Sequence, residues 1–544
     1  MRSRRKLMTW DRVPGWICDW HIAGWFDSGL QHNPAPNLFG QKNSTRWTED
    51  HLAKWGGVAK LQDVPKNTSE LAAPFVLYPL TLSPILELKR APAEFPDWET
   101  RLKDINSDLW DKLYYAFALV DSPEEGDAVL HFSGWDGGRL WINGELKFEE
   151  HSYHHIIPDM ERCDFKLRKG LNAILFQLDR DGVTARIELP GREAEQEKLR
   201  GIAVGTPPEP RKVSHFTMLA HYAKSMKIKR PFKGSTKEDL AKWQKSFGSH
   251  YLRCLGPAPM RPKKLPEPHK VSEVQIEGAV RKRYHLSCEG GGEIPAYVFL
   301  PEAGRGNGRT LVIAHGHENP ERCAGIVKPT GPVMTKTRRT ENYAEQMAQQ
   351  GFVVGLIHER NFGERRDNWD GDDPCNNSGL RALAMGHTLP RLHIADLHLL
   401  FDFLCTFPEV DPQRIGLGGL SGGGSLSYIT GAFDQRFKAV SVFCGMTRYE
   451  DYALGHGCGM QVVPGLYPTG DVGEVLALIA PRPLLVAQGR LDSTFNVIRV
   501  KSIVEDARKA YKAAAAEEKL QLEIMELAHQ FDPELAGRFF TKWL

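Results

Sequence analysis

The sequence predicts two unlike parts, an antiparallel β-sandwich followed by a doubly wound, mostly parallel α/β sheet. After about residue 271, apolar runs of four to eight residues alternate with amphipathic helical stretches, which is typical of a parallel sheet covered by helices on both faces. Between Tyr114 and Leu189, shorter β-branched and aromatic runs are separated by Gly, Asp and Asn turns, which favours a sandwich.

Proline-rich stretches mark the boundaries between these parts. Gly205–Val213 and Leu255–Val271 have the composition of extended, semi-rigid spacers. Between them, the capping-box pattern at Ser235–Asp239 predicts the start of a helix. We therefore expect an unassigned N-terminal arm over 1–65, the β-sandwich over 66–204, a proline-rich and helical linker over 205–270, and the α/β domain over 271–544.

The expected strands follow one another in chain order. Those of the sandwich are YYAFALV, AVLHFSG, RLWING, CDFKL, NAILFQLD and TARIEL. Those of the parallel sheet are TLVIAHG, FVVGLIHE, RIGLGGLS, AVSVFCG, PLLVAQG and QLEIMEL. In the first set apolar and polar residues often alternate, as in a half-buried strand, whereas the second set consists mostly of continuous apolar residues.

Charge and cysteine content exclude several classes of protein. The 544 residues contain 70 Lys+Arg and 68 Asp+Glu, a net charge of +2, which removes the electrostatic reason to expect nucleic acid or an anionic membrane as partner. Nine cysteines without a C-x-x-C pair argue against a disulfide scaffold, a zinc ribbon and a thioredoxin-type motif. The basic start lacks a following apolar stretch, so we expect a soluble protein retained in the cytoplasm.

The clearest chemical motif is a G-x-S-x-G centred on Ser421, from Gly419 to Gly423. The serine follows an apolar strand and opens an expected helix, the setting in which a nucleophilic serine projects from a tight turn. Glycines two residues to either side let the two backbones approach closely. An ordinary Gly/Ser turn is the alternative, and the strand–turn–helix context favours the nucleophile.

A nucleophilic serine needs a general base, which in turn needs an acid to orient it. Asp492 comes just after the strand PLLVAQG, and His529 just after QLEIMEL. Both stand where the chain order Ser…Asp…His of a doubly wound hydrolase requires them. We expect most other histidines to be surface residues or hydrogen-bonded structural residues. Asp532 is too near His529 in sequence for the role of the acid, and we expect it to cap the final helix.

The oxyanion formed by attack on a carbonyl needs backbone donors. The sequence predicts one from the N–H of Gly422 and a second from His317, in the His315-Gly316-His317 turn after TLVIAHG. The alternative is a metal bound by the two histidines. Because no acidic or cysteine ligand stands at a supporting spacing, we expect no metal.

Five ordered stretches give the chain a resemblance to a known group. They are IPAYVFLPE, GFVVGLIHERNFGER, FPEVDPQRIGLGGLSGGG, IAPRPLLVAQGRLDSTF and LAHQFD. They resemble the acetyl xylan esterase and dienelactone hydrolase-like branch of the α/β-hydrolases, over roughly 271–544. The resemblance implies a serine hydrolase of carboxylic esters that needs no cofactor, with the triad Ser421, Asp492 and His529. Dienelactone hydrolases proper use cysteine as nucleophile, whereas this chain has Ser421 at that position. Lactones are therefore less favoured as substrates.

The stretch Asp136–Gly144, with RKGLNAILFQLD after it, resembles galactose-binding-like β-domains. Such a domain either binds sugar or has a structural role, and Trp141, on an alternating strand, is expected in the core.

The hydrolase resemblance of 271–544 implies an acetyl-type esterase acting on acylated sugars or other small esters.

Arg360 and Trp369 lie in the loop His358–Leu380, which we expect to form the wall of the substrate pocket. A serine peptidase and a non-catalytic carbohydrate-binding protein are the alternative functions. The sequence leaves a homo-oligomer open.

Overall fold

A computed structural model gives the structure of the chain. It describes residues 20–27, 76–78, 85–87, 112–134, 137–151, 161–179, 182–192, 222, 226–259, 268–288, 292–317, 319–327, 342–366, 374–452, 458–490, 492, 494–495, 497–527 and 529–544. The chain divides into two compact units, Met1–Tyr222 and Ala223–Leu544.

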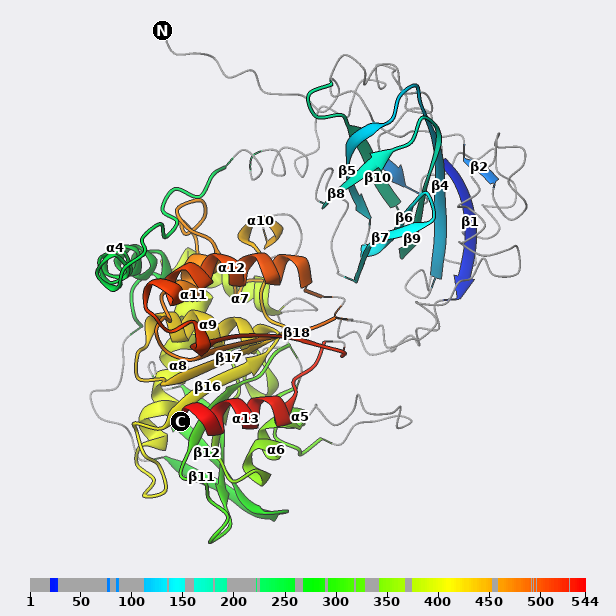
Figure 1. Ribbon diagram of the computed structural model, residues 1–544. Helices are drawn as coiled ribbons and strands as arrows, with labels where there is room; N and C mark the ends of the chain where they lie inside the picture. Colours follow the sequence, from blue (N-terminus) through cyan, green and yellow to red (C-terminus); the bar gives the residue numbers. More distant parts are fainter. Residues whose placement is uncertain are drawn as a thin grey trace. The chain divides into compact units, whose positions relative to one another are not determined.

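The first unit contains two antiparallel sheets (Figure 1). One has the order β2-β1-β4-β9-β6-β7 and the other β3-β10-β5-β8. The strands are β1 (Trp20–Asp27), β2 (Val76–Tyr78), β3 (Ile85–Glu87), β4 (Lys112–Ser122), β5 (Gly126–Gly134), β6 (Gly137–Ile142), β7 (Glu145–His151), β8 (Glu161–Leu167), β9 (Gly170–Asp179) and β10 (Gly182–Glu188). The six strands expected between Tyr114 and Leu189 are all present, and β1 adds a strand from the arm that the sequence left unassigned.

Apolar side chains from both sheets form one core cluster in this unit. It includes Val120 of β4, Phe132 of β5, Phe176 of β9 and Ile187 of β10. Trp141 is 7% exposed, which confirms its expected place in the interior. The antiparallel sandwich predicted from the strand pattern is therefore confirmed.

The helix expected in the linker is α4 (Lys237–Leu255). Thr236 and Asp239 form the capping box at its start: the Thr236 side chain accepts from the Asp239 N–H at 3.1 Å, and the Asp239 carboxylate accepts from the Thr236 N–H at 3.2 Å. Its buried face, with Phe247 and Tyr251, joins a core cluster of the second unit. This helix therefore contributes to the packing of the α/β domain.

The second unit is built on a nine-stranded sheet with the order β11-β12-β13-β15-β14-β16-β17-β18-β19. Neighbours are antiparallel from β11 to β15 and parallel from β15 to β19. The strands are β11 (His269–Ile276), β12 (Ala279–Ser287), β13 (Glu293–Pro301), β14 (Thr310–Ala314), β15 (Val353–Ile357), β16 (Ile415–Leu420), β17 (Ala439–Phe443), β18 (Leu484–Gly489) and β19 (Leu520–Met525).

The six apolar runs of the sequence form the parallel strands β14 to β19, as predicted. Every residue of β14 to β18 is buried, because helices cover both faces of the sheet. The edge strand β11 is mostly exposed. The helices are α5 (Pro320–Cys323), α6 (Tyr343–Gln349), α7 (Pro374–Ala384), α8 (Leu389–Leu404), α9 (Gly422–Phe433), α10 (Tyr449–Asp451), α11 (Val472–Ala477), α12 (Val497–Ala513) and α13 (Pro533–Trp543), with short 3₁₀ turns at Gly363–Arg365 and Glu517–Lys519.

Two large apolar clusters lie on opposite faces of this sheet. Helices α6 and α13 contribute to one of them, and α4, α9, α11 and α12 contribute to the other, an arrangement that can be followed in Figure 1. The doubly wound, mostly parallel sheet predicted from the sequence is confirmed. Among the described residues, the structure contains no helix with the length and hydropathy needed to cross a bilayer.

Candidate active site

Ser421 occupies a strained turn between β16 and α9. Its backbone has φ 59° and ψ −122°, the left-handed region that non-glycine residues rarely adopt. A Cβ placed on Gly419 would lie 2.4 Å from the carbonyl oxygen of Ala314, and one on Gly423 would lie 2.0 Å from the same atom. Strand, turn and helix approach this closely because both positions are glycine, as the sequence predicted.

Asp492 and His529 form a direct pair beyond the ends of β18 and β19. The Nδ1 atom of His529 lies 3.1 Å from each carboxylate oxygen of Asp492. The Asp492 side chain is fully buried, and that of His529 is 14% exposed. Burial would raise the pKa of Asp492, but the charge and hydrogen bond of His529 hold it below its ordinary value.

Other donors fix the Asp492 carboxylate. Its Oδ1 accepts from the backbone N–H of Thr494 at 2.7 Å, and its Oδ2 accepts from Nε2 of Gln488 at 2.9 Å. The same Gln488 amide donates to the carbonyl of Phe495 at 2.9 Å, so it ties the loop after β18 to its own strand. Gln488 was not among the residues predicted from the sequence, and its only signal there is a polar residue in an otherwise apolar strand.

Backbone hydrogen bonds connect the carboxyl ends of neighbouring strands at this edge of the sheet. The N–H of Ser421 donates to the carbonyl of Phe443 at 2.9 Å, and the N–H of Cys444 donates to that of Ala487 at 2.9 Å. The N–H of Arg490 donates to the carbonyl of Met525 at 2.8 Å. These bonds hold the segments that carry Ser421, Asp492 and His529 at one edge, where open α/β sheets place their sites.

The turn His315-Gly316-His317 adjoins the residue after Ser421. A Cβ on Gly422 would lie 3.2 Å from the Nδ1 and Cε1 atoms of His317, so this ring packs against the start of α9. His315 is buried; its Nδ1 donates to the carbonyl of Gly316 at 2.7 Å, and its Nε2 accepts from the N–H of Glu359 at 3.0 Å. His315 therefore holds the turn, because both of its ring nitrogens are engaged with the backbone.

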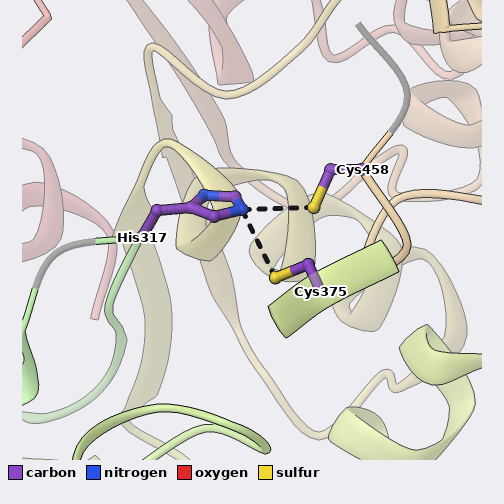
Figure 2. Close-up of side chains that lie close together, drawn as sticks. All are labelled: His317, Cys375 and Cys458. Carbon is purple, nitrogen blue, oxygen red and sulfur yellow. Dashed lines mark hydrogen bonds between the residues drawn. The ribbon is translucent and has the colours of Figure 1, made fainter. Parts of the chain in front are cut away.

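The side chain of His317 points toward two cysteines that are distant in sequence (Figure 2). Its Nε2 lies 3.1 Å from Sγ of Cys458 and 3.4 Å from Sγ of Cys375. The hydrogen bond from Cys375 lowers the pKa of Cys458 well below its ordinary value, against the effect of burial and together with the charge of His317. No signal of this cluster exists in the local sequence around His317.

Arg360, expected in the pocket wall, pairs with the buried Asp396. Its Nε and Nη2 atoms donate to the two carboxylate oxygens at 2.9 and 2.7 Å, and Arg365 adds a third bond at 2.8 Å. Burial would raise the pKa of Asp396, but these two guanidinium groups hold it below its ordinary value. Trp369 lies outside the described residues. The substrate contacts predicted for Arg360 and Trp369 stay predictions.

Asp532 and two interior histidines lie outside the Asp492–His529 pair. Asp532 accepts from the N–H groups of Glu534 and Leu535 at 3.0 Å each and is the N-cap of α13, which confirms its expected role. Burial lowers the pKa of His358 and of His393 to about 3 each, so both are neutral interior residues.

Comparisons with known proteins give distant relatives. No protein-family model matches the chain. A protein of Bacillus subtilis (strain 168) named "Putative hydrolase YtaP" is 24% identical over 304 residues, which are 54% of this chain and 97% of that protein.

Two solved structures are similar to part of the chain. A "putative acetyl xylan esterase" of Bacteroides fragilis NCTC 9343 is similar with a TM-score of 0.47 and 15% identity, over 58% of this chain and 83% of that one. A glucuronoyl esterase of Solibacter usitatus is similar with a TM-score of 0.44 and 16% identity, over 57% of this chain and 94% of that one.

The topology itself identifies the fold of the second unit. Antiparallel strands lead into a parallel, doubly covered sheet. A serine with positive φ stands between β16 and α9, and an Asp–His pair follows β18 and β19. Strand–turn–helix geometry around a G-x-S-x-G, followed in the chain by Asp and then His, is the arrangement of the α/β-hydrolases. The C-terminal part of the chain has the α/β-hydrolase fold.

Proposed function

We propose that this protein is a serine hydrolase of carboxylic esters, with Ser421 as nucleophile, His529 as general base and Asp492 as the acid that orients it. The observation that carries the proposal is the buried Asp492–His529 pair at the same sheet edge as a serine held at φ 59°. Strain of this kind is retained where it exposes a reacting group. The name of the Bacillus subtilis relative agrees with a hydrolase.

The proposed chemistry depends on which of the two ring nitrogens of His529 carries the proton. An ionised carboxylate only accepts hydrogen bonds, so Nδ1 of His529 carries the proton that Asp492 accepts. Nε2 is then the basic nitrogen, which takes the proton of Ser421 as its Oγ attacks the acyl carbon. The resulting imidazolium protonates the leaving alcohol, and a water activated by the same nitrogen releases the acid from the acyl-enzyme.

The negative oxygen of the tetrahedral intermediate needs donors that are already in place. Gly422 is the first residue of α9, so its N–H is one of the N-terminal donors that a helix leaves without an internal partner. The N–H of His317, in the turn packed against Gly422, is the second proposed donor. Losing one such donor typically costs about 10²–10³ in kcat.

Acetyl esters of sugars and other small carboxylic esters are the proposed substrates. The support is the resemblance of five ordered stretches in 271–544 to the acetyl xylan esterase branch. One methylene more or less in the acyl group changes transition-state binding by only about 1–3 kcal/mol. The preferred acyl length therefore has to be measured. A panel of acetylated, feruloylated and glucuronoyl sugar esters beside aryl esters and peptide anilides separates esterase from peptidase activity.

Turnover of p-nitrophenyl acetate by Ser421→Ala tests the proposal. Loss of the nucleophile is expected to lower kcat/KM by at least about 10⁴-fold. Ser427→Ala is the matched control, because Ser427 lies on the same helix, is buried, and only donates to the carbonyl of Gly423. Activity of Ser421→Ala above a few per cent of that of Ser427→Ala would remove Ser421 from the role.

A further inference from the structure

Three side chains that are distant in sequence converge at one point beside α7. His317 follows β14, Cys375 lies in the first turn of α7, and Cys458 precedes the segment 459–461. Their ligand atoms, one imidazole nitrogen and two sulfurs, all lie within 4.8 Å of one another. Figure 2 shows both sulfurs directed at the same ring nitrogen.

Two sulfurs approach the same ring nitrogen in this cluster. Nε2 of His317 lies 3.1 Å from Sγ of Cys458 and 3.4 Å from Sγ of Cys375. Hydrogen bonds from Cys375 and His317 to Cys458 are one use of this arrangement, and the three atoms are also the imidazole nitrogen and thiolate types that bind zinc. A cation bound between the three atoms engages all of them at once.

The spacings fit a soft cation with tetrahedral geometry. Zinc binds nitrogen at about 2.0–2.1 Å and sulfur at about 2.3 Å, which places the nitrogen and a sulfur of one tetrahedral site about 3.6 Å apart. The two nitrogen–sulfur distances here are 3.1 and 3.4 Å. Each needs to lengthen by only about 0.2–0.5 Å to reach the zinc geometry. Thiolate and imidazole ligands select zinc over the hard cations magnesium and calcium.

The surrounding backbone holds the two cysteines together. A Cβ on Gly459 would lie 2.1 Å from the carbonyl oxygen of Cys375, and one on Gly379 would lie 2.8 Å from the Cα of Gly459. The N–H of Gly459 also donates to Oδ1 of Asn376 at 2.8 Å. The segment after Cys458 is therefore seated tightly on α7, and the glycines permit this close approach.

Apolar packing encloses the same place. Cys375 is 2% exposed and belongs to an apolar cluster with Phe362, Leu426 and Met460, against which Cys458 also packs. The ring of Phe362 meets that of His317 edge to face, with centroids 5.6 Å apart. An apolar shell of this kind limits access of water to a bound ion.

We propose that His317, Cys375 and Cys458 bind one zinc ion. Among the described residues the cluster offers three ligands, as catalytic zinc sites do, and a water or an external ligand would complete the tetrahedron. Bound there, the ion would connect the turn of His317 to α7 and to the segment after Cys458. The site does not depend on the proposed function, because its ligands are side chains that the ester hydrolysis does not use.

Metal analysis of the full chain, purified without a histidine tag, tests the proposal. We expect about one zinc per chain, removed by a chelator and restored by added zinc. Cobalt(II) added to the zinc-free protein should give a thiolate-to-cobalt charge-transfer band that saturates at one equivalent. Alkylation of Cys375 and Cys458, followed by peptide mass mapping, should be slower with zinc than without it.

Single substitutions locate the site. Cys375→Ser and Cys458→Ser should each weaken zinc binding at least about 10-fold and reduce the cobalt band, and thermal melting checks that each variant is folded. Cys254→Ser is the matched control, because Sγ of Cys254 also contacts one histidine nitrogen, 3.3 Å away in His250, and it should bind zinc as the wild type does.

Several outcomes would overturn the proposal. These are a zinc-free protein that takes up no stoichiometric zinc or cobalt, a disulfide between Cys375 and Cys458 in the protein as purified, and binding of copper(I) without zinc. A cobalt band that persists unchanged in both cysteine variants would also overturn it. The wild-type measurements decide the matter even if a variant does not fold.

Discussion

Both carboxylate oxygens of Asp492 lie 3.1 Å from Nδ1 of His529, although the two residues are 37 positions apart in the chain. Each stands just past a parallel strand, and β18 and β19 are hydrogen-bonded neighbours. Their pairing is therefore a direct consequence of sheet order. It fixes which ring nitrogen of His529 carries the proton, and the proposed mechanism depends on that tautomer.

Asp492→Asn should lower kcat by about 10³–10⁴-fold with little change in KM. The amide can donate a hydrogen bond to Nδ1, which favours the wrong tautomer and no longer stabilises an imidazolium. Stopped-flow or steady-state hydrolysis of p-nitrophenyl acetate measures the effect. Asp532→Asn is the control, since asparagine caps a helix as well as aspartate does; equal activities of the two variants would contradict the role of Asp492.

Gln488→Leu should lower kcat by roughly 10–100-fold while KM stays close to that of the wild type. The substitution removes the 2.9 Å hydrogen bond to Asp492, and a hydrogen bond to a charged group is worth about 1.5–3 kcal/mol. Gln488 acts through Asp492, so it is a positioning residue. Gln521→Leu, which removes a glutamine amide bonded to Glu523 on β19, should leave kcat unchanged; a parallel loss in both variants would count against the assignment.

Gly423→Ala should destabilise the fold by about 1–3 kcal/mol or more, because overpacking forces the backbone apart. The new Cβ would meet backbone atoms of Ala314 and His315 at 2.0–2.5 Å. Gly306→Ala is the control, as a Cβ there meets nothing within 4 Å, and it should stay within about 0.5 kcal/mol of the wild type. Denaturant unfolding measures both; an unaffected Gly423→Ala would refute the close approach.

Glu474→Gln should stabilise the protein increasingly as the pH rises from about 4.5 to about 7. Burial raises the pKa of Glu474 from 4.5 to about 7, so the unfolded chain loses this proton first and wild-type stability falls across that window. Glutamine still accepts from the N–H of Asp471 in the capping box and does not ionise.

The gain in unfolding free energy over that window should be at most about 3 kcal/mol, from about 1.4 kcal/mol per pH unit. Urea unfolding at several pH values measures it, with Glu518→Gln at an exposed position as control. Parallel curves for Glu474→Gln and the wild type would show that Glu474 does not titrate in this range.

Much of the α/β domain could be predicted because its strands are buried on both faces. β14 and β18 are continuous apolar runs, and such runs are visible in a single sequence. The positions of Asp492 and His529 followed from strand order, and the positions of Gly419 and Gly423 from the steric needs of the serine turn. These features depend on neighbours in the chain or on the order of elements.

Features that depend on packing between distant segments could not be predicted. Cys375 and Cys458 are 58 and 141 residues from His317, so no spacing rule connects the three side chains. The salt bridge of Arg360 with Asp396 was missed for the same reason. The strand β1 was missed because its partners, β2 and β4, lie far along the chain.

Labelling with a fluorophosphonate, followed by intact-mass and peptide mass analysis, determines whether Ser421 is the nucleophile. A serine activated by a histidine base forms a covalent adduct with this reagent, and an inert scaffold does not. We predict one adduct per chain, located on Ser421, absent from Ser421→Ala and strongly slowed in His529→Ala. A chain that stays unlabelled, or an adduct on another residue with Ser421 unmodified, would show that Ser421 is not an activated nucleophile.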